Sequence, residues 1–193
     1  MRRSAAETRE HVLAVTHELF YRRGIRAVGV DRIASESSVG PTTLYRLFPS
    51  KDVLVAAYVR RADRLYRAWF TPAAATDGRS ARQRILAVFD ALGEHLVPAT
   101  RRGCPFHLVL AEFPDPQLAA HRLAVAHERW VRHRFHDLTA ELAREADVAD
   151  PAALADHLTL VAEGALAMVA FLEPGATARA ARSLVLRLLP PEP

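Results

Sequence analysis

The sequence has a single cysteine and no long apolar run. Cys104 alone cannot form a disulfide within the chain or a site built from several thiolates, which is typical of proteins kept in a reducing compartment. No apolar stretch reaches the roughly 20 residues that a membrane-spanning helix needs. The first ten residues are polar and carry both signs of charge, unlike a secretory signal peptide. We therefore expect a cytoplasmic protein with no membrane partner.

Glycine and lysine are also scarce. Only 8 of the 193 residues are glycine, and 50% are hydrophobic. This composition excludes a largely disordered chain and supplies enough apolar side chains for a packed core. Among the 26 basic residues, Lys51 is the only lysine.

Positive charge is concentrated toward the N-terminus. Residues 1–67 hold 13 Lys and Arg against 7 Asp and Glu, whereas residues 68–193 hold 13 against 15. A basic end on a nearly neutral body suits an anionic polymer such as nucleic acid, because phosphate neutralisation supplies most of the non-specific affinity. A solvated, arginine-rich surface would give the same composition, so charge alone does not separate the two.

Helical periodicity dominates the chain, and no stretch shows the sustained two-residue alternation of a strand. The pattern predicts an all-α fold of about nine helices, over residues 6–23, 30–37, 41–48, 51–70, 80–96, 106–113, 116–146, 151–172 and 176–189. Pro72 and the small and polar residues that follow it are expected to end the fourth helix.

The two short predicted helices, 30–37 and 41–48, are joined by only three residues. A corner of this size matches the helix-turn-helix, whose second helix enters the major groove of DNA. Leu44 and Phe48 lie four residues apart and are expected to pack inward. The rest of that helix then presents donors suited to phosphate oxygens and base edges, namely Thr42, Thr43, Tyr45 and Arg46.

Residues 8–61 resemble the N-terminal domain of TetR-type (tetracycline-repressor-like) regulators. The resemblance rests on ELFYRRG and VDRIASESSVGPTTLYRLFPSKDVLVAAYV, which hold the first helix, the helix-turn-helix and the start of the fourth helix at fixed spacing. It implies that Pro41, Thr42 and Tyr45 lie near base edges and that Thr43 and Tyr45 contact phosphates. It also implies that Lys51 binds phosphate at the start of the fourth helix.

The chemistry of Lys51 agrees with that role. An ammonium group at a helix N-terminus opposes the helix dipole, and a phosphate partner gives a reason for its presence. A plain solvated lysine is the alternative.

Three features depart from the sequence that is usual in this family. Gly29 stands where Ser or Thr commonly caps the second helix, and the turn reads Ser38-Val39-Gly40 where Gly-Val-Ser is frequent. Leu47 occupies a position often held by histidine. These departures make the operator sequence unpredictable and leave DNA binding as the expected activity.

Two domains are expected: a DNA-binding domain over residues 1–50 and a ligand-binding and dimerisation domain over residues 51–193. Beyond residue 62 the resemblance is looser and is carried by GCPFHLVLAEFPDP and the final pair of helices. It implies that this part of the chain binds a small ligand and forms a homodimer.

The segment 154–172 carries two apolar stripes, which predicts burial on two sides, one by its own core and one by a symmetry mate. The predicted interface is shared with the last helix and comprises Leu154, Leu158, Val161, Ala165, Met168, Leu184, Val185 and Leu188. A central helix buried within one subunit is the alternative. A dimer fits a palindromic operator, since recognition helices about 34 Å apart read successive major grooves.

An effector pocket is the feature that the sequence determines least. The candidate lining residues are Trp69, Phe89, Cys104, Phe106, His107, Trp130 and Met168. Glu112 is a further candidate for a polar contact. Ordinary core or surface positions are the alternative for each of them. We expect a small-molecule effector of unknown identity and no cofactor.

The histidines do not form a metal-ligand pattern. His121, His127 and His133 recur every six residues and so spread around a helix, while His133 and His136 share a face but provide only two ligands. We therefore expect no metal.

Two other classes of function compete with the regulator. Cys104 and His107, three residues apart, would suit a nucleophile and its base in an enzyme, but no orienting acid or recognisable motif accompanies them. A helical dimerisation module without a DNA role is the other. The expected function is a non-enzymatic, ligand-relieved repressor that binds a palindromic double-stranded DNA operator as a homodimer.

Overall fold

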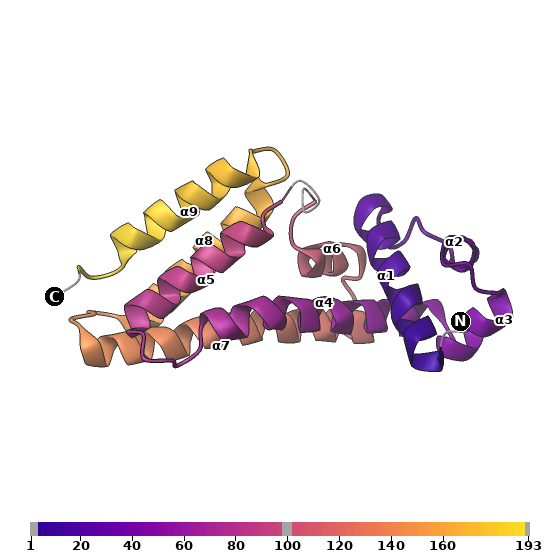
Figure 1. The fold of residues 1–193 in the computed structure, drawn as a ribbon, viewed down its shortest axis with the longest axis horizontal. Coiled ribbons are helices and arrows are strands. Elements are labelled where there is room, and N and C mark those ends of the chain that lie inside the picture. Colours follow the sequence, from indigo (N-terminus) through magenta and orange to yellow (C-terminus); the bar gives the residue numbers. More distant parts are fainter. Residues whose placement is uncertain (1–3, 98–101, 192–193) are drawn as a thin grey trace. The chain divides into compact units, whose positions relative to one another are not determined.

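The computed structural model describes residues 4–97 and 102–191, and over these residues it contains nine α-helices and no strand (Figure 1). The helices are α1 (Ala5–Arg23), α2 (Val30–Glu36), α3 (Pro41–Leu47), α4 (Lys51–Ala73), α5 (Ala81–His95), α6 (Pro105–Glu112), α7 (Ala119–Glu145), α8 (Pro151–Met168) and α9 (Pro174–Leu188). This confirms the predicted all-α fold. Within the described ranges, no helix combines the length and the apolar character needed to cross a membrane.

Most predicted helix ends lie within two residues of the structure; the exceptions are the start of α7, at Ala119 instead of residue 116, and the C-terminal ends of α4 and α8. α4 continues to Ala73, so Pro72 lies inside its last turn instead of beyond its end. A proline there removes only one hydrogen bond of a helix that is about to end, and the small residues that follow complete the stop. α8 ends at Met168 rather than at residue 172, with Val169 as its C-cap.

The described residues pack as two compact units. Unit 1 comprises residues 1–64 and 105–126, and unit 2 comprises residues 65–104 and 127–193. This division does not follow the predicted boundary at residue 50, because the first turns of α4 and the segment containing α6 pack with the N-terminal helices. The assignment of DNA binding to residues 1–50 and of ligand binding to residues 51–193 stays a prediction.

Unit 1 begins with a well-capped helix. The Ser4 hydroxyl accepts from the Glu7 backbone N–H at 3.2 Å, and the Glu7 carboxylate accepts from the Ser4 N–H at 2.7 Å, which satisfies two donors at the start of α1. α1 ends at Gly24, whose φ of +91° favours glycine. Inside the unit, the rings of Phe20 and Tyr58 meet edge to face with centroids 5.4 Å apart, and this contact packs α1 against α4.

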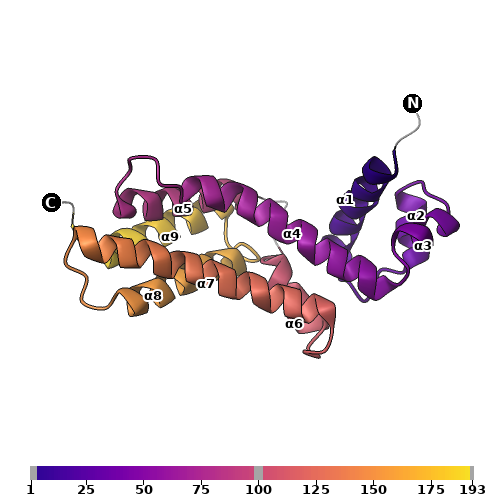
Figure 2. The same ribbon diagram turned by 90° about the horizontal axis from the view of Figure 1, so that it is seen from below.

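Unit 2 is built around a buried apolar core contributed by the end of α4 and by α5, α7, α8 and α9. α9 lies along α5 and α8 in both views (Figure 1, Figure 2). The large side chains in the core of unit 2 include Phe70, Phe89 and Phe135. The ring of Phe135 contacts each of the other two rings at a centroid distance of 5.7 Å. The buried guanidinium of Arg84 donates to the Ala74 carbonyl and to the Glu141 carboxylate, so its positive charge is hydrogen-bonded inside the protein.

Candidate functional site

α3 presents a polar face that its own packing fixes in place. It starts at Pro41, a residue suited to the first turn, and its inward residues Leu44 and Phe48 are only 1% and 2% exposed, as predicted. The predicted DNA-contacting residues of this helix lie on the opposite side, with Thr43 half-buried and Pro41, Thr42, Tyr45 and Arg46 exposed. The exposed fraction of Tyr45 is 48%, so its ring and hydroxyl are accessible to a partner.

The turn between α2 and α3 is held from two directions. Ser38 adopts φ +55°, a left-handed conformation that glycine takes more easily than serine. The buried Ser37 hydroxyl donates to the Ile33 carbonyl at 2.5 Å, and His11 Nε2 of α1 donates to the Ser37 carbonyl at 3.0 Å. These bonds fix the angle at which α3 leaves the turn.

Lys51 lies at the first residue of α4, as predicted, but its ammonium group already has a protein partner. Nζ donates to the Arg26 carbonyl at 3.1 Å. Partial burial lowers the pKa of Lys51, and the nearby Glu112 carboxylate acts in the opposite direction. The structure therefore ties Lys51 to the turn after α1, and its contact with phosphate stays a prediction.

Glu112, the last residue of α6, holds the same turn. Its two carboxylate oxygens accept hydrogen bonds from the backbone N–H groups of Ile25 at 2.9 Å and Arg26 at 2.7 Å. The Arg26 guanidinium bonds back to the Glu112 carbonyl at 2.7 Å and lies over the ring of Phe113. Glu112 therefore orders the turn that precedes the helix-turn-helix, and its contact with an effector stays a prediction.

The predicted dimer interface divides into core and surface. Leu154, Leu158, Ala165 and Val185 are buried in unit 2, so their packing belongs to the protomer's own core. Val161, Met168 and Leu188 are half-buried and Leu184 is exposed. The most exposed leucine of the described residues is Leu160 of α8, at 69%.

Between α8 and α9 lies an almost wholly apolar groove of about 400 Å³, lined by Leu160, Val161, Gly164, Ala165, Met168, Thr177, Ala180, Ala181 and Leu184. The apolar surface of these two helices is therefore centred on Leu160 and Leu184. Val161, Ala165, Met168 and Leu184 of the predicted interface line this groove, and its role in dimerisation stays a prediction.

The predicted pocket residues have several different surroundings. Trp69 and Trp130 both contact the ring of Tyr66, at centroid distances of 4.5 and 6.5 Å. Phe89 is buried in the core of unit 2, and Met168 lines the groove between α8 and α9. Phe106 and His107 belong to unit 1, where Phe106 is buried. A cavity of about 440 Å³ beside Arg84 and Glu141 is lined by other residues.

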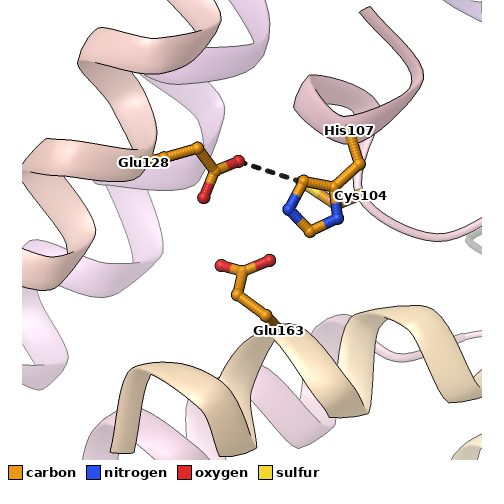
Figure 3. Close-up of side chains that lie close together, drawn as sticks. All are labelled: Cys104, His107, Glu128 and Glu163. Atoms are coloured by element: carbon orange, nitrogen blue, oxygen red, sulfur yellow. Dashed lines mark hydrogen bonds between the residues drawn. The ribbon is translucent and has the colours of Figure 1, made fainter. Parts of the chain in front are cut away.

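Cys104 belongs to a compact polar cluster inside unit 2. Its thiol donates to Glu128 Oε1 of α7 at 3.8 Å, and the Glu163 carboxylate of α8 faces the same space (Figure 3). The sulfur and the nearest carboxylate oxygens lie within 4.8 Å of one another. Gly103, at φ +79°, lets the chain pass close to α8, where an added Cβ would meet the Leu166 carbonyl at 3.0 Å.

Burial and mutual repulsion dominate the electrostatics of this cluster. Desolvation, followed by the charge of Glu128, raises the pKa of Glu163 to about 8. Desolvation also raises the pKa of the buried Tyr66 well above its usual range, and Glu163, Cys104 and Glu128 add to that shift. Cys104, Glu128 and Glu163, which each carry negative charge when ionised, thus lie together in a space of low polarity.

Sequence reasoning missed both carboxylates of this cluster. Glu128 is one of many charged residues on α7, and nothing in its local pattern marks it. Glu163 carried a signal, since it is the only Asp, Glu, Lys or Arg between residues 157 and 172 of a strongly apolar segment. A lone carboxylate on such a segment is unusual without a specific environment.

Comparisons with known proteins agree with this arrangement. A family model described as bacterial regulatory proteins, tetR family, matches residues 12–58. The HTH-type transcriptional regulator YjdC of Escherichia coli is 28% identical over 158 residues, which cover 82% of this chain and 81% of YjdC.

Solved structures extend the likeness over nearly the whole chain. The crystal structure of a TetR-family transcriptional regulator from Streptomyces coelicolor is 33% identical, with a TM-score of 0.87, and the match covers 95% of this chain and 94% of that one. The reduced form of NemR from Escherichia coli shares the fold, with a TM-score of 0.80 at 21% identity over 93% and 95% of the two chains. The chain therefore belongs to the TetR family of DNA-binding transcriptional regulators, a family of regulators and not of enzymes, as its sequence predicted.

Proposed function

We propose that this regulator is a repressor that binds a palindromic operator as a homodimer through α3 and releases it when a small ligand binds. The observation that carries the DNA-binding part is the face of α3. A short helix anchored by two buried apolar residues displays Thr42, Tyr45 and Arg46 to solvent, in a unit with excess positive charge. Hydroxyl, phenol and guanidinium groups on one helix face suit phosphate and base-edge contacts.

The operator is best identified by selecting bound sequences from random duplex DNA, because palindromic symmetry in the selected site also tests dimeric binding. Affinity for that operator is then measured between about 50 and 200 mM salt for the wild type and two variants, Tyr45→Ala and Arg46→Ala. Loss of a good base contact weakens binding by about 1–3 kcal/mol, or roughly fivefold to 150-fold. Loss of a phosphate contact lowers the salt slope by about one.

Arg22→Ala is a matched control for Arg46→Ala. Arg22 is an exposed arginine of the same unit that pairs with Glu18 on α1, and its removal is expected to leave operator affinity within about twofold of the wild type. If both α3 variants bound the operator as tightly as the wild type, α3 would not be the recognition helix. A response to salt that is flat in the wild type would instead favour a helical module without a DNA role.

The homodimer is supported by the exposed apolar surface of α8 and α9. Leu160 and Leu184 are 69% and 46% exposed beside an apolar groove, and large exposed leucines that share a patch are typical of an interaction surface. Replacing Leu160 by glutamate is expected to convert the protein to a monomer in sedimentation and to weaken operator binding. Leu65→Glu, at another exposed leucine, is the control and should remain dimeric.

Ligand relief rests on the continuity of α4. This helix runs without interruption from Lys51, beside the turn at the start of the helix-turn-helix, to Ala73 in unit 2. We infer that a ligand bound by the C-terminal part shifts α4 and so changes the separation of the two recognition helices. An operator affinity that no class of ligand altered would contradict this mechanism.

A further inference from the structure

The cluster of Cys104, Glu128 and Glu163 joins donors of two chemical kinds from three separate elements. Cys104 lies directly before α6, Glu128 in the first half of α7 and Glu163 in α8. The three residues are 24 and 35 positions apart in sequence, so only the packing of unit 2 brings them together. Their side chains converge on one point (Figure 3).

The spacing of these donors matches a first coordination shell. Zinc bonds of about 2.3 Å to sulfur and about 2.1 Å to oxygen place the two ligand atoms about 3.6 Å apart in a tetrahedral site. The Cys104 sulfur and Glu128 Oε1 are 3.8 Å apart, and all donors of the cluster lie within 4.8 Å. Shifts of up to about 1 Å at the flexible glutamate ends would bring donors that lie within 4.8 Å of one another to the separations of a tetrahedral shell.

The kinds of donor select the kind of metal. Mg²⁺ and Ca²⁺ favour shells made only of oxygen, whereas a thiolate with carboxylates suits a borderline ion such as Zn²⁺. Three protein ligands leave a fourth position open.

We propose that Cys104, Glu128 and Glu163 form a binding site for a zinc ion in unit 2. The sequence alone led to the opposite expectation, because it offered only histidines on one helix as candidate ligands. A divalent ion balances the negative charge of the ionised thiolate and carboxylates, which burial otherwise makes unfavourable. The alternative is a hydrogen-bonded cluster held by a shared proton without any metal.

Cobalt(II) is the probe that separates these alternatives. It occupies zinc sites, and a cobalt–thiolate bond gives a charge-transfer absorption in the near ultraviolet. Because Cys104 is the only cysteine, this band identifies the ligand without ambiguity. The full-length protein, reduced with a non-thiol phosphine and freed of metal with a chelator, is titrated with cobalt and then with zinc. We expect one cobalt per chain, the thiolate band, and loss of the band when zinc displaces cobalt.

Variants test each ligand. Cys104→Ser is expected to abolish the band, and Glu128→Gln and Glu163→Gln each to weaken zinc binding by at least tenfold in competition with a chromogenic chelator. Glu94→Gln, at an exposed glutamate of α5, is the control and should bind zinc like the wild type. Circular dichroism shows whether each variant is folded.

The wild-type titration decides the proposal even if a variant fails to fold. Absence of the thiolate band at saturating cobalt, or a stoichiometry well below one per chain, overturns the site. Zinc affinity that is unchanged in folded Glu128→Gln and Glu163→Gln proteins overturns the assignment of the carboxylates. None of these measurements uses DNA, so their outcome is independent of the proposed repressor function.

Discussion

Replacing Glu112 by alanine should destabilise unit 1, because one carboxylate holds two backbone N–H groups of the turn after α1. These are the N–H groups of Ile25 and Arg26, at 2.9 and 2.7 Å. The Ile25 residue is 1% exposed, so its N–H cannot turn to bulk water without local opening. The substitution therefore removes two charge-assisted hydrogen bonds and leaves at least one donor buried and unsatisfied.

The magnitude follows from these contacts. A hydrogen bond to a charged group contributes about 1.5–3 kcal/mol, and an unsatisfied buried donor costs about 1–3 kcal/mol. Because Arg26 is exposed and water can replace its bond, we expect a total loss of about 2–4 kcal/mol for Glu112→Ala. Glu112→Gln keeps one acceptor oxygen and should lose about half as much. Either value is a large fraction of a typical stability of about 5–15 kcal/mol.

Urea unfolding followed by circular dichroism measures the loss, and amide hydrogen exchange locates it. The Ile25 N–H should exchange faster in Glu112→Ala than in the wild type. The control is Glu18→Ala, which removes an exposed ion pair with Arg22 and should change the unfolding free energy by less than about 0.5 kcal/mol. If Glu112→Ala were no less stable than Glu18→Ala, or if exchange at Ile25 were unchanged, the reasoning would be refuted.

Two further changes test the packing of the two units. Burial lowers the pKa of His17 in the folded protein, and the charge of Arg61 adds to the effect. Below about pH 6.5 the unfolded state therefore binds more protons than the folded state. The unfolding free energy should rise with pH up to about 6.5, and His17 contributes at most about 1.4 kcal/mol per pH unit to this rise. Urea titrations at several pH values should show a shallower rise for His17→Gln and no change for the exposed His133→Asn, and equal slopes in all three proteins would contradict the role of His17. Gly103→Ala should destabilise by about 1–3 kcal/mol, since it places a side chain at positive φ and 3.0 Å from the Leu166 carbonyl. Gly40→Ala, where the backbone is extended and the space is open, should lose less than about 1 kcal/mol in the same thermal unfolding assay, and a similar loss in both variants would argue against strain at residue 103.

The sequence by itself determined the helices and the inner face of α3. Their signals are local: an apolar period of 3.6 residues, a capping serine, and a proline or glycine at a helix end act within one or two turns of the chain. For this reason Leu44 and Phe48 were predicted to face inward from their spacing alone, and the structure confirms it. The family could also be predicted from a local sequence motif, because the helix-turn-helix and its flanking helices are contiguous in the chain.

Only the tertiary structure decided which side of α8 is core and which is surface. Periodicity identified two apolar stripes but could not rank them, and the packing of unit 2 buries Leu158 completely while it leaves Leu160 69% exposed. The same limit applies to Glu112, which binds a turn 86 residues away, and to the meeting of Cys104, Glu128 and Glu163. Contacts between distant segments depend on how whole helices pack, and a polar residue on a helix shows its partner only when the neighbouring helix is in place.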